Sequence, residues 1–312
     1  MKHIKIESSI PGISLDVIYL VPVTTPKALV IVLHGMSEHK ERYNYFLEQL
    51  AANAYLPVIY DHRGHGKSVK SPEDLGYFYS DDATSLSEDA KIIITYFKER
   101  YPHLKVILFA HSMGTLVARN YLSKYDKELT KLILCGPPTK NNLVDVGLSL
   151  AKLANTFGNP KKANKFLDKL TFGNFNKKYQ EPNEWLSKNP ENVKIYNNDS
   201  LCGFTFTTNG FLNLYTLQKY AFETKRYQVN NKSLQILLIA GSDDPVIRSL
   251  QKFQELQTFL QDLGYNNTKS LIYKDLRHEL LQENSRDLII QDILEFIRKK
   301  EIYEKENIIR HR

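Results

Sequence analysis

The chain has 312 residues, of which 42% are hydrophobic and 25% charged, and a formal net charge of +7. This composition is that of a globular protein, and no stretch approaches the roughly 18 uncharged apolar residues of a membrane-spanning helix. Two cysteines, Cys135 and Cys202, exclude a disulfide framework. Because Met1 to Glu7 lack the hydrophobic stretch of a signal peptide, we expect a cytoplasmic protein.

The excess positive charge is concentrated in the middle of the chain. Between Pro138 and Asn230 there are 13 Lys and Arg against seven Asp and Glu, so this segment carries nearly all of the surplus. It shows neither the interleaved aromatic and basic residues of single-strand binders nor helix-turn-helix spacing, so we expect no nucleic-acid partner. Two interpretations remain. The segment is either a lysine-rich solvated surface or a surface that contacts an anionic membrane peripherally.

Strands and helices are predicted to alternate through the first part of the chain. Ile4 to Ser8 and Ser14 to Val21 indicate an antiparallel pair, because Pro11-Gly12 between them is a turn signal. Ser85 and Glu88 form a capping box that predicts the start of a helix. Apolar runs and periodic patterns then predict four elements: a strand at Ala28 to Leu33, a helix at Arg42 to Ala52, a strand at Leu56 to Tyr60 and a helix at Ser85 to Lys98.

The most informative pattern is Ala110-His111-Ser112-Met113-Gly114. It lies directly between a predicted strand, Lys105 to Phe109, and a predicted helix, Thr115 to Lys124. A serine with small residues two positions before and after it, between a strand and a helix, is typical of a nucleophile elbow. The turn exposes the hydroxyl group at a helix N-terminus, whose dipole favours developing negative charge. We therefore predict that Ser112 is a catalytic nucleophile.

The alternation stops at Pro137-Pro138 and resumes about 90 residues later. The segment between contains helical patterns at Asn142 to Ala154 and Lys161 to Leu170. The flanking elements are a strand at Leu132 to Cys135, a strand at Leu234 to Ala240, a helix at Leu250 to Leu263, a strand at Ser270 to Tyr273 and a closing helix at Ser285 to Glu301.

About eight strands joined by crossover helices predict an α/β protein with a doubly wound, mostly parallel eight-stranded sheet. Residues 1–137 and 231–312 are expected to form this core, and residues 138–230 a mostly helical cap or lid insertion. Such sheets bind ligands at the carboxyl ends of their strands, so the insertion is expected to cover the site. The alternative is a second domain unrelated to the site.

A nucleophilic serine needs a base, and the base needs a carboxylate that orients it. With this architecture the acid follows the serine in the chain, and the histidine follows the acid. The strand after the insertion ends at Asp243-Asp244, and His278 is the only histidine between these residues and the C-terminal tail. His278 is therefore predicted as the base, and the residues themselves leave Asp243 and Asp244 as alternatives.

The remaining histidines are predicted to have structural roles. His62 and His65 are spaced as a metal pair would be, but no third ligand accompanies them, so a structural turn is favoured. Gly66-Lys67-Ser68 is not a phosphate loop, because Asp61 stands where that motif requires glycine. His111 is assigned to packing beside the nucleophile, and His39 to the surface.

The oxyanion formed by attack of Ser112 needs two donors. The backbone N–H of the residue after the nucleophile, Met113, is one candidate, and the loop after the early buried strand nominates Met36. We predict that both N–H groups converge on one point near the Ser112 hydroxyl.

At these positions the chain resembles the monoacylglycerol lipase and lysophospholipase branch of the α/β-hydrolases, which is grouped by sequence with serine aminopeptidases. The resemblance rests on six motifs that span almost the whole chain: His34-Gly35-Met36-Ser37-Glu38-His39 with Arg42-Tyr43, Asp61 to Ser68, His111 to Gly114, Asn198 to Phe204, Gly241 to Asp244 and Arg277-His278-Glu279.

This resemblance implies a triad of Ser112, Asp244 and His278, with oxyanion donors Met36 and Met113 and with neither cofactor nor metal. It thus favours Asp244 over Asp243. Two departures from the family pattern are Ser37 and Ala110, which both stand where glycine is usual.

The implied chemistry is ester hydrolysis through an acyl-enzyme. The Phe-rich, basic insertion suits a lipid ester with one acyl chain, either a monoacylglycerol or a lysophospholipid. A small-ester carboxylesterase and a peptidase that releases N-terminal residues are the alternatives. The peptidase would need an acidic anchor for the substrate amine, and the net basic insertion argues against it. A catalytically inactive receptor is disfavoured because all three triad residues are present.

Overall fold

The computed structural model describes residues 1–299 and 308–310 of the chain, and among them nine strands form one sheet. The strand order is β1-β2-β4-β3-β5-β6-β7-β8-β9. The pairs β1–β2 and β2–β4 are antiparallel, and every later pair is parallel. The strands are β1 (Lys2–Glu7), β2 (Ser14–Tyr19), β3 (Ala28–Leu33), β4 (Leu56–Tyr60), β5 (Lys105–His111), β6 (Leu129–Cys135), β7 (Gln235–Gly241), β8 (Thr268–Tyr273) and β9 (Ile308–Arg310).

The eight predicted strands correspond to β1 to β8, and the expected doubly wound, mostly parallel sheet is confirmed. The ninth, β9, extends the sheet by pairing with β8 through three residues. Three residues are too few to show a strand period, so the sequence pattern could not predict this strand. The closing helix α9 (Arg286–Arg298) ends before its predicted end, and Glu301 lies outside the described residues.

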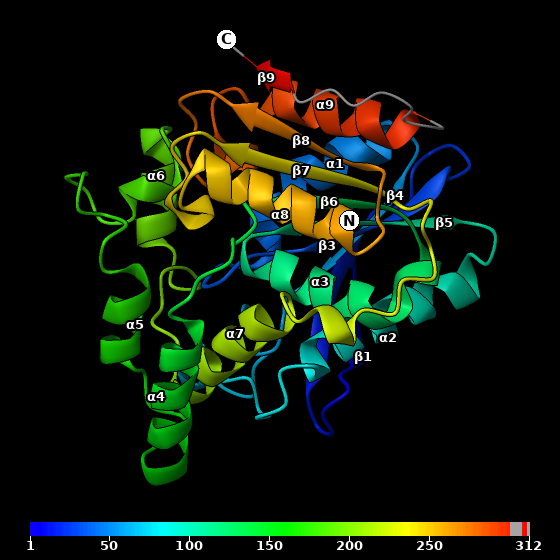
Figure 1. Ribbon diagram of the computed structural model, residues 1–312. Helices are drawn as coiled ribbons and strands as arrows, with labels where there is room; N and C mark the ends of the chain where they lie inside the picture. The colour runs from blue at the N-terminus through cyan, green and yellow to red at the C-terminus, as the bar shows by residue number, and fades with distance from the viewer. Residues whose placement is uncertain (300–307, 311–312) are drawn as a thin grey trace.

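Helices cover both faces of the sheet (Figure 1). The alternation of side chains along β3 explains why both faces are buried: Leu29 and Ile31 belong to one hydrophobic cluster, and Val30 and Val32 to the other. The first cluster includes side chains of α2 (Ser85–Arg100), α3 (Met113–Tyr125) and α8 (Leu250–Asp262), and the second those of α1 (Asn44–Ala52) and α9.

The capping box predicted for α2 is wrong. Thr84 is the N-cap residue, and Ser85 already lies in the first turn. The Ser85 hydroxyl donates to the carbonyl of Asp82 and accepts from Arg63, while Glu88 accepts from Lys124 and Tyr125 of α3. Tertiary partners therefore replace the local reciprocal pair.

Four helices form in residues 138–230, which we call the insertion. They are α4 (Val144–Phe157), α5 (Lys165–Phe172), α6 (Pro190–Asn198) and α7 (Thr208–Tyr220). They gather at the end of the molecule toward which the arrows of β7 and β8 point (Figure 1). The sequence patterns predicted α4 and α5 only. Ten of the 13 residues of α7 are buried, so this helix has no polar face and no 3.6-residue period.

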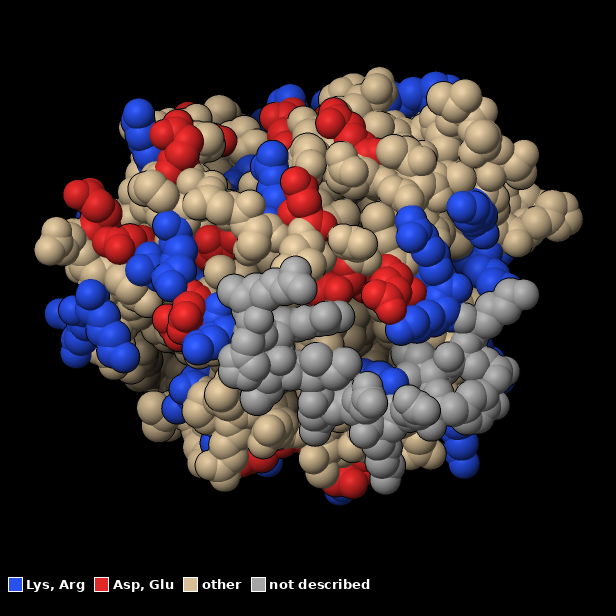
Figure 2. Space-filling view, turned by 90° about the horizontal axis from the view of Figure 1, so that it is seen from above, with Lys and Arg blue, Asp and Glu red and all other residues tan. Residues whose placement is uncertain are grey.

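Acidic and basic side chains are interspersed on the face that carries α9 (Figure 2). None of the helices formed by the described residues is long and apolar enough to cross a membrane.

Candidate active site

Ser112 occupies the turn between β5 and α3 in a strained conformation. Its φ of 50° and ψ of −121° lie outside the regions that L-residues ordinarily adopt. Its backbone N–H donates to the carbonyl of Cys135 on β6 at 2.9 Å, which holds the turn against the sheet. A Cβ at Gly114 would lie 2.5 Å from the carbonyl oxygen of Leu33, so only glycine fits there. These features match the predicted nucleophile elbow.

The three side chains predicted as the triad lie in one hydrogen-bonded chain. The Nε2 atom of His278 is 2.8 Å from the Ser112 Oγ, and its Nδ1 atom is 2.9 Å from the Asp244 Oδ2. His278 and Asp244 are 2% and 4% exposed, so water cannot compete for these bonds. The other Asp244 oxygen accepts the backbone N–H of Val246, which fixes the carboxylate.

The two adjacent carboxylates are now distinguished by position. Asp244 is buried against His278, whereas Asp243 is exposed and accepts a hydrogen bond from Ser242. The neighbouring Gly136 has a φ of 56°, and a Cβ there would come within 2.9 Å of the His278 Nδ1. A side chain at this position would therefore displace the imidazole.

Both predicted oxyanion donors line the cavity that contains Ser112. Met113 is the first residue of α3, where backbone N–H groups lack intrahelical partners. Met36 follows Gly35, whose carbonyl oxygen is 2.8 Å from the His34 Nδ1. Because a trans peptide directs its N–H opposite to its carbonyl, this bond also sets the direction of the Met36 N–H.

The tautomer of His34 follows from its second contact. Its Nε2 accepts the backbone N–H of His62 at 2.9 Å, so the neutral ring must carry its proton on Nδ1 and donate to Gly35. Burial and the neighbouring His62 and His65 lower the pKa of His34 well below its usual value. The rings of His62 and His65 pack 4.5 and 5.2 Å from that of His34, which agrees with their predicted structural role.

Glu38 is a buried charge that sequence analysis did not single out. It accepts the backbone N–H of Gly35 at 2.6 Å and the Tyr43 hydroxyl at 2.9 Å, and it lies 3.1 Å from the His111 Nδ1. Burial would raise the pKa of Glu38, but the hydrogen bond from His111 and the Arg42 charge hold it well below its usual value. The carboxylate thus stays charged and holds the loop that carries Met36.

Arg42 joins the Met36 loop to the loop that carries His278. Its guanidinium contacts Glu38 at 2.8 Å and Glu279, the neighbour of His278, at 2.6 Å. It also donates to Asn192 of α6 at 3.0 Å. Glu38, Arg42 and Glu279 occur in the motifs that carry the family resemblance, but only the three-dimensional arrangement shows that they form one buried network.

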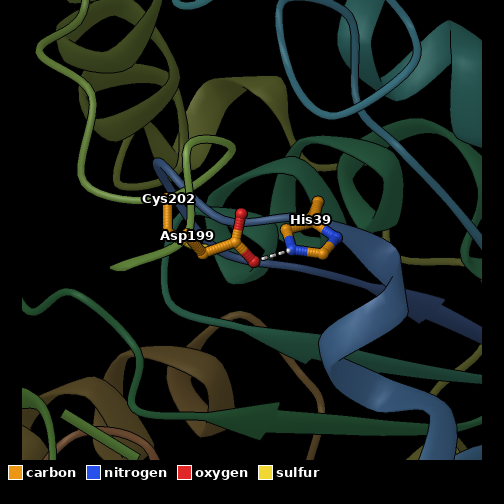
Figure 3. Close-up of side chains that lie close together, drawn as sticks. All are labelled: His39, Asp199 and Cys202. Atoms are coloured by element: carbon orange, nitrogen blue, oxygen red, sulfur yellow. Dashed lines mark hydrogen bonds and ion pairs between the residues drawn. The ribbon is translucent and has the colours of Figure 1, made fainter. Parts of the chain in front are cut away.

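His39 is buried rather than on the surface, which corrects the sequence prediction. Its Nε2 atom is 2.8 Å from the Asp199 Oδ2, and Cys202 lies in the same loop as Asp199 (Figure 3). The histidine was misassigned because its partner is 160 residues away.

These three groups have potential ligand atoms within 4.8 Å of one another and could in principle hold a metal. Their partners favour a different role. The other Asp199 oxygen accepts the backbone N–H of Leu201 at 2.8 Å, and burial raises the pKa of the Cys202 thiol, which stays protonated. The His39–Asp199 bond therefore links the Met36 loop to the insertion directly.

A cavity of about 380 Å³ extends from Ser112 into the insertion. Trp185 covers the imidazole of His278, with ring centroids 5.3 Å apart, and Phe175 packs on Trp185 at 5.1 Å. The insertion supplies the aromatic and aliphatic walls Leu143, Leu170, Phe172, Phe175, Trp185, Phe204 and Leu214, together with the polar side chains Asn141, Asp168, Asn174 and Gln218.

The sheet order, the strained serine turn and the serine–histidine–aspartate chain define the α/β-hydrolase class of protein. A carboxyl esterase from Bacillus coagulans, solved in complex with glycerol, has the same fold: the TM-score is 0.88 over 95% of this chain and 97% of that chain, at 24% identity.

Residues 24–285 match the family model described as serine aminopeptidase, S33, and the chain belongs to this family. It is 31% identical over 139 residues to a monoacylglycerol lipase of Mycolicibacterium smegmatis, covering 43% of this chain and 48% of the relative. It is 29% identical over 185 residues to the human monoglyceride lipase, covering 59% and 55%. The chain thus spans about half the length of the curated relatives it matches.

Proposed function

We propose that this protein is a serine hydrolase that cleaves carboxylic esters of single-acyl-chain lipids through an acyl-enzyme. The observation that carries the proposal is the hydrogen-bonded chain from Ser112 through His278 to Asp244, which opens into a largely apolar cavity. The similarity to lipases that act on monoacylglycerols supports the same class of substrate.

In the proposed first step, His278 Nε2 accepts the proton of the Ser112 hydroxyl as Ser112 Oγ attacks the ester carbonyl. The buried Asp244 carboxylate keeps the imidazole oriented and stabilises its protonated form. The carbonyl oxygen acquires negative charge, which the backbone N–H groups of Met36 and Met113 stabilise. Each such donor typically contributes roughly 3–4 kcal/mol of transition-state stabilisation.

The tetrahedral intermediate then collapses and the alcohol leaves with the proton from His278. An ester now joins the acyl group to Ser112 Oγ. A water molecule loses its proton to His278 and attacks this ester, and the second collapse releases the fatty acid and restores the serine hydroxyl.

The insertion is proposed to act as a cap that binds the acyl chain. Its aromatic and aliphatic side chains line the cavity above Ser112, and a volume of about 380 Å³ lies within the range of small-molecule sites. Asparagine, glutamine and aspartate side chains among them suit the hydroxyl groups of a glycerol or a glycerophosphate head. A monoacylglycerol or a lysophospholipid is therefore the proposed substrate.

The proposal is tested with purified protein and monoacylglycerols of increasing acyl length. Wild type should hydrolyse long-chain esters with a higher kcat/KM than acetyl esters, and Ser112→Ala should lower kcat by about a million-fold without loss of fold. Activity that survives Ser112→Ala would overturn the nucleophile. A sharp preference for acetyl esters would contradict the proposed lipid substrate and indicate a small ester instead.

We also propose that the insertion contacts anionic membranes. Along α4, apolar side chains are exposed at a helical spacing: Val146, Leu153 and Phe157 are 54%, 57% and 84% exposed. Phe166 of α5 is 66% exposed. Exposed lysines lie in α4 and α5 or between them in the sequence: Lys152, Lys161, Lys162, Lys165 and Lys169, of which Lys161 pairs with Asp74. An apolar stripe beside basic side chains is typical of a helix that lies at a lipid interface.

An aminopeptidase is the second candidate, because the family model carries that description and because an acidic side chain of the insertion does line the cavity. Asp168 is half buried, and burial raises the pKa of its carboxyl group. It could bind a substrate amine, which the charge balance of the sequence disfavoured. Hydrolysis of aminoacyl p-nitroanilides, abolished by Asp168→Asn, would support this function, and activity on esters alone would exclude it.

A further inference from the structure

The loop that presents Met36 is held from two sides. On the core side, Gly35 is fixed by Glu38 through its N–H and by His34 through its carbonyl. On the other side, Ser37 and His39 contact the insertion. Met36, the proposed oxyanion donor, lies between residues restrained by the core and residues restrained by the insertion.

Ser37 needs such restraint because its φ is 52°, a left-handed backbone conformation that residues other than glycine rarely adopt. Three hydrogen bonds from the insertion stabilise it. The Ser37 carbonyl accepts the Tyr196 hydroxyl and the backbone N–H of Gly203, both at 2.9 Å, and the Ser37 hydroxyl donates to the carbonyl of Phe204 at 2.7 Å.

The bond between His39 and Asp199 adds a fourth link from the same stretch of the insertion (Figure 3). Ser37, His39 and Tyr196 are each 6% exposed, so water does not compete for their bonds. The ring of Tyr196 is fixed independently of its hydroxyl, because the Arg42 guanidinium stacks 4.9 Å from its centroid. Residues 196–204, which we call the clamp, therefore hold the loop at both sides of Glu38.

We propose that the clamp positions the Met36 N–H for transition-state stabilisation, with Tyr196 and Asp199 as positioning residues. This inference rests on the proposed ester hydrolysis. When the clamp is loosened, the strain at Ser37 is released by rotation about its backbone, and rotation there moves the Met36 peptide away from its geometry. Tyr196 also lines the cavity, but its hydroxyl is bonded to Ser37. A variant that keeps the ring and removes only this hydroxyl therefore leaves the cavity wall in place, and the defect falls on the transition state rather than on substrate binding.

The decisive variant is Tyr196→Phe, which removes one bond to the Ser37 carbonyl and leaves the ring stacked under Arg42. Its kcat for a monoacylglycerol should fall about tenfold with little change in KM, since complete loss of an oxyanion donor costs roughly 100-fold or more. The matched control is Tyr220→Phe, which removes a hydroxyl from the last residue of α7, outside the residues that line the cavity, and should leave kcat unchanged.

Two further measurements separate positioning from general damage. The Ki of a trifluoromethyl ketone, which forms an oxyanion on Ser112, should rise by the same factor as kcat falls, while the Ki of an unreactive amide analogue stays constant. Ser37→Gly removes the backbone strain together with the hydroxyl bond to Phe204. Tyr196→Phe should therefore lower kcat much less in the Ser37→Gly protein than in the wild type, so the double variant should regain most of the kcat lost by Tyr196→Phe when it is measured against Ser37→Gly alone.

A fall in kcat/KM that comes from KM, or a double variant no better than Tyr196→Phe, would overturn the proposal. If Tyr196→Phe does not fold, Asp199→Asn, which weakens the His39 link, carries the same comparison. Failure of the ester hydrolase proposal is recognised separately, because hydrolysis would then survive Ser112→Ala, whereas the clamp variants leave the nucleophile unchanged.

Discussion

The core and the insertion build the same site by different means. Ser112, Asp244 and His278 follow β5, β7 and β8, whose parallel hydrogen bonds fix the places where the strands end. The insertion reaches the site through loops and short helices that rest on side-chain hydrogen bonds. The comparison indicates that the hydrogen-bonded Ser112, His278 and Asp244 depend on the sheet, while the cavity and the clamp depend on side-chain contacts made by the insertion.

The largest expected effect tests the core. Asp244→Asn should lower kcat by about 10,000-fold, because an amide in place of the carboxylate no longer stabilises the protonated imidazole or its tautomer. The neighbouring exposed carboxylate provides the matched control, and Asp243→Asn should change kcat less than about twofold. Steady-state hydrolysis of a p-nitrophenyl ester measures both. Equal losses would remove the distinction between the two aspartates.

The next effect lies where the core and the insertion meet. Arg42→Met leaves the carboxylates of Glu38 and Glu279 buried without their cation, so the free energy of unfolding should fall by about 3–5 kcal/mol. Lys219→Met breaks the pair with Asp145 on the surface of the insertion, where the two side chains are 46% and 73% exposed, and should cost less than about 1 kcal/mol. Urea titration gives both values. A small loss for Arg42→Met would mean that the two regions are only loosely joined.

The third prediction concerns the outer surface of the insertion alone. Leu153→Asp combined with Phe157→Asp should weaken binding to phosphatidylglycerol-containing vesicles at least about 100-fold in a co-sedimentation assay, because each apolar side chain gains roughly 1.5–3 kcal/mol when buried and 1.4 kcal/mol is a factor of ten. Neither residue lines the cavity, so hydrolysis of a water-soluble ester should not change. Leu250→Asp, an exposed leucine of the core, is the control and should leave vesicle binding intact. Unchanged vesicle binding by the double variant would refute the proposal that this surface contacts membranes.

The smallest expected effect is on the pH dependence of stability, and it comes from Lys131 in the core. Burial lowers the pKa of Lys131 on β6 from 10.5 to about 8, so between these pH values the unfolded chain keeps a proton that the folded chain has lost. Stability must therefore rise with pH across this window. Lys131→Met should remove that rise. Lys131 is 7% exposed, but its ammonium group donates to the carbonyls of Phe296 and Lys299, which offsets part of the cost of burial. The difference should therefore be only about 1 kcal/mol. Denaturant titrations of both proteins at pH 7.5 and 9.5 give the change in the free energy of unfolding between these pH values. An equal change in the two proteins would contradict the lowered pKa of Lys131.

The sequence predicts the core far better than the insertion, for physical reasons. Strands β3 and β4 begin and end at the predicted residues, because each is a continuous apolar run buried on both faces. The serine turn was predictable because its steric demands fall on adjacent residues. In the insertion, α6 and α7 were not predicted. Helix α6 is short and polar, and α7 is largely buried, so neither shows a clear hydrophobic period.

Sequence order predicted which three side chains would lie together, but it did not indicate the residues that support them. Ser112, Asp244 and His278 each follow a strand in an order that the architecture fixes. The partners of Glu38, Arg42 and His39 lie up to 237 residues away, and their pairing depends on where irregular loops come to rest. The family resemblance did show that Ser37 stands where glycine is usual, but only the backbone angle of 52° shows that the serine is strained there.

The central claim is that Ser112 is an activated nucleophile, and one measurement tests it most directly. The protein is incubated with a fluorophosphonate, digested and analysed by mass spectrometry for the modified peptide. We predict stoichiometric labelling at Ser112, which slows sharply in His278→Ala and is absent in Ser112→Ala. Labelling at another serine, or an unreactive Ser112 in the folded wild-type protein, would contradict the claim.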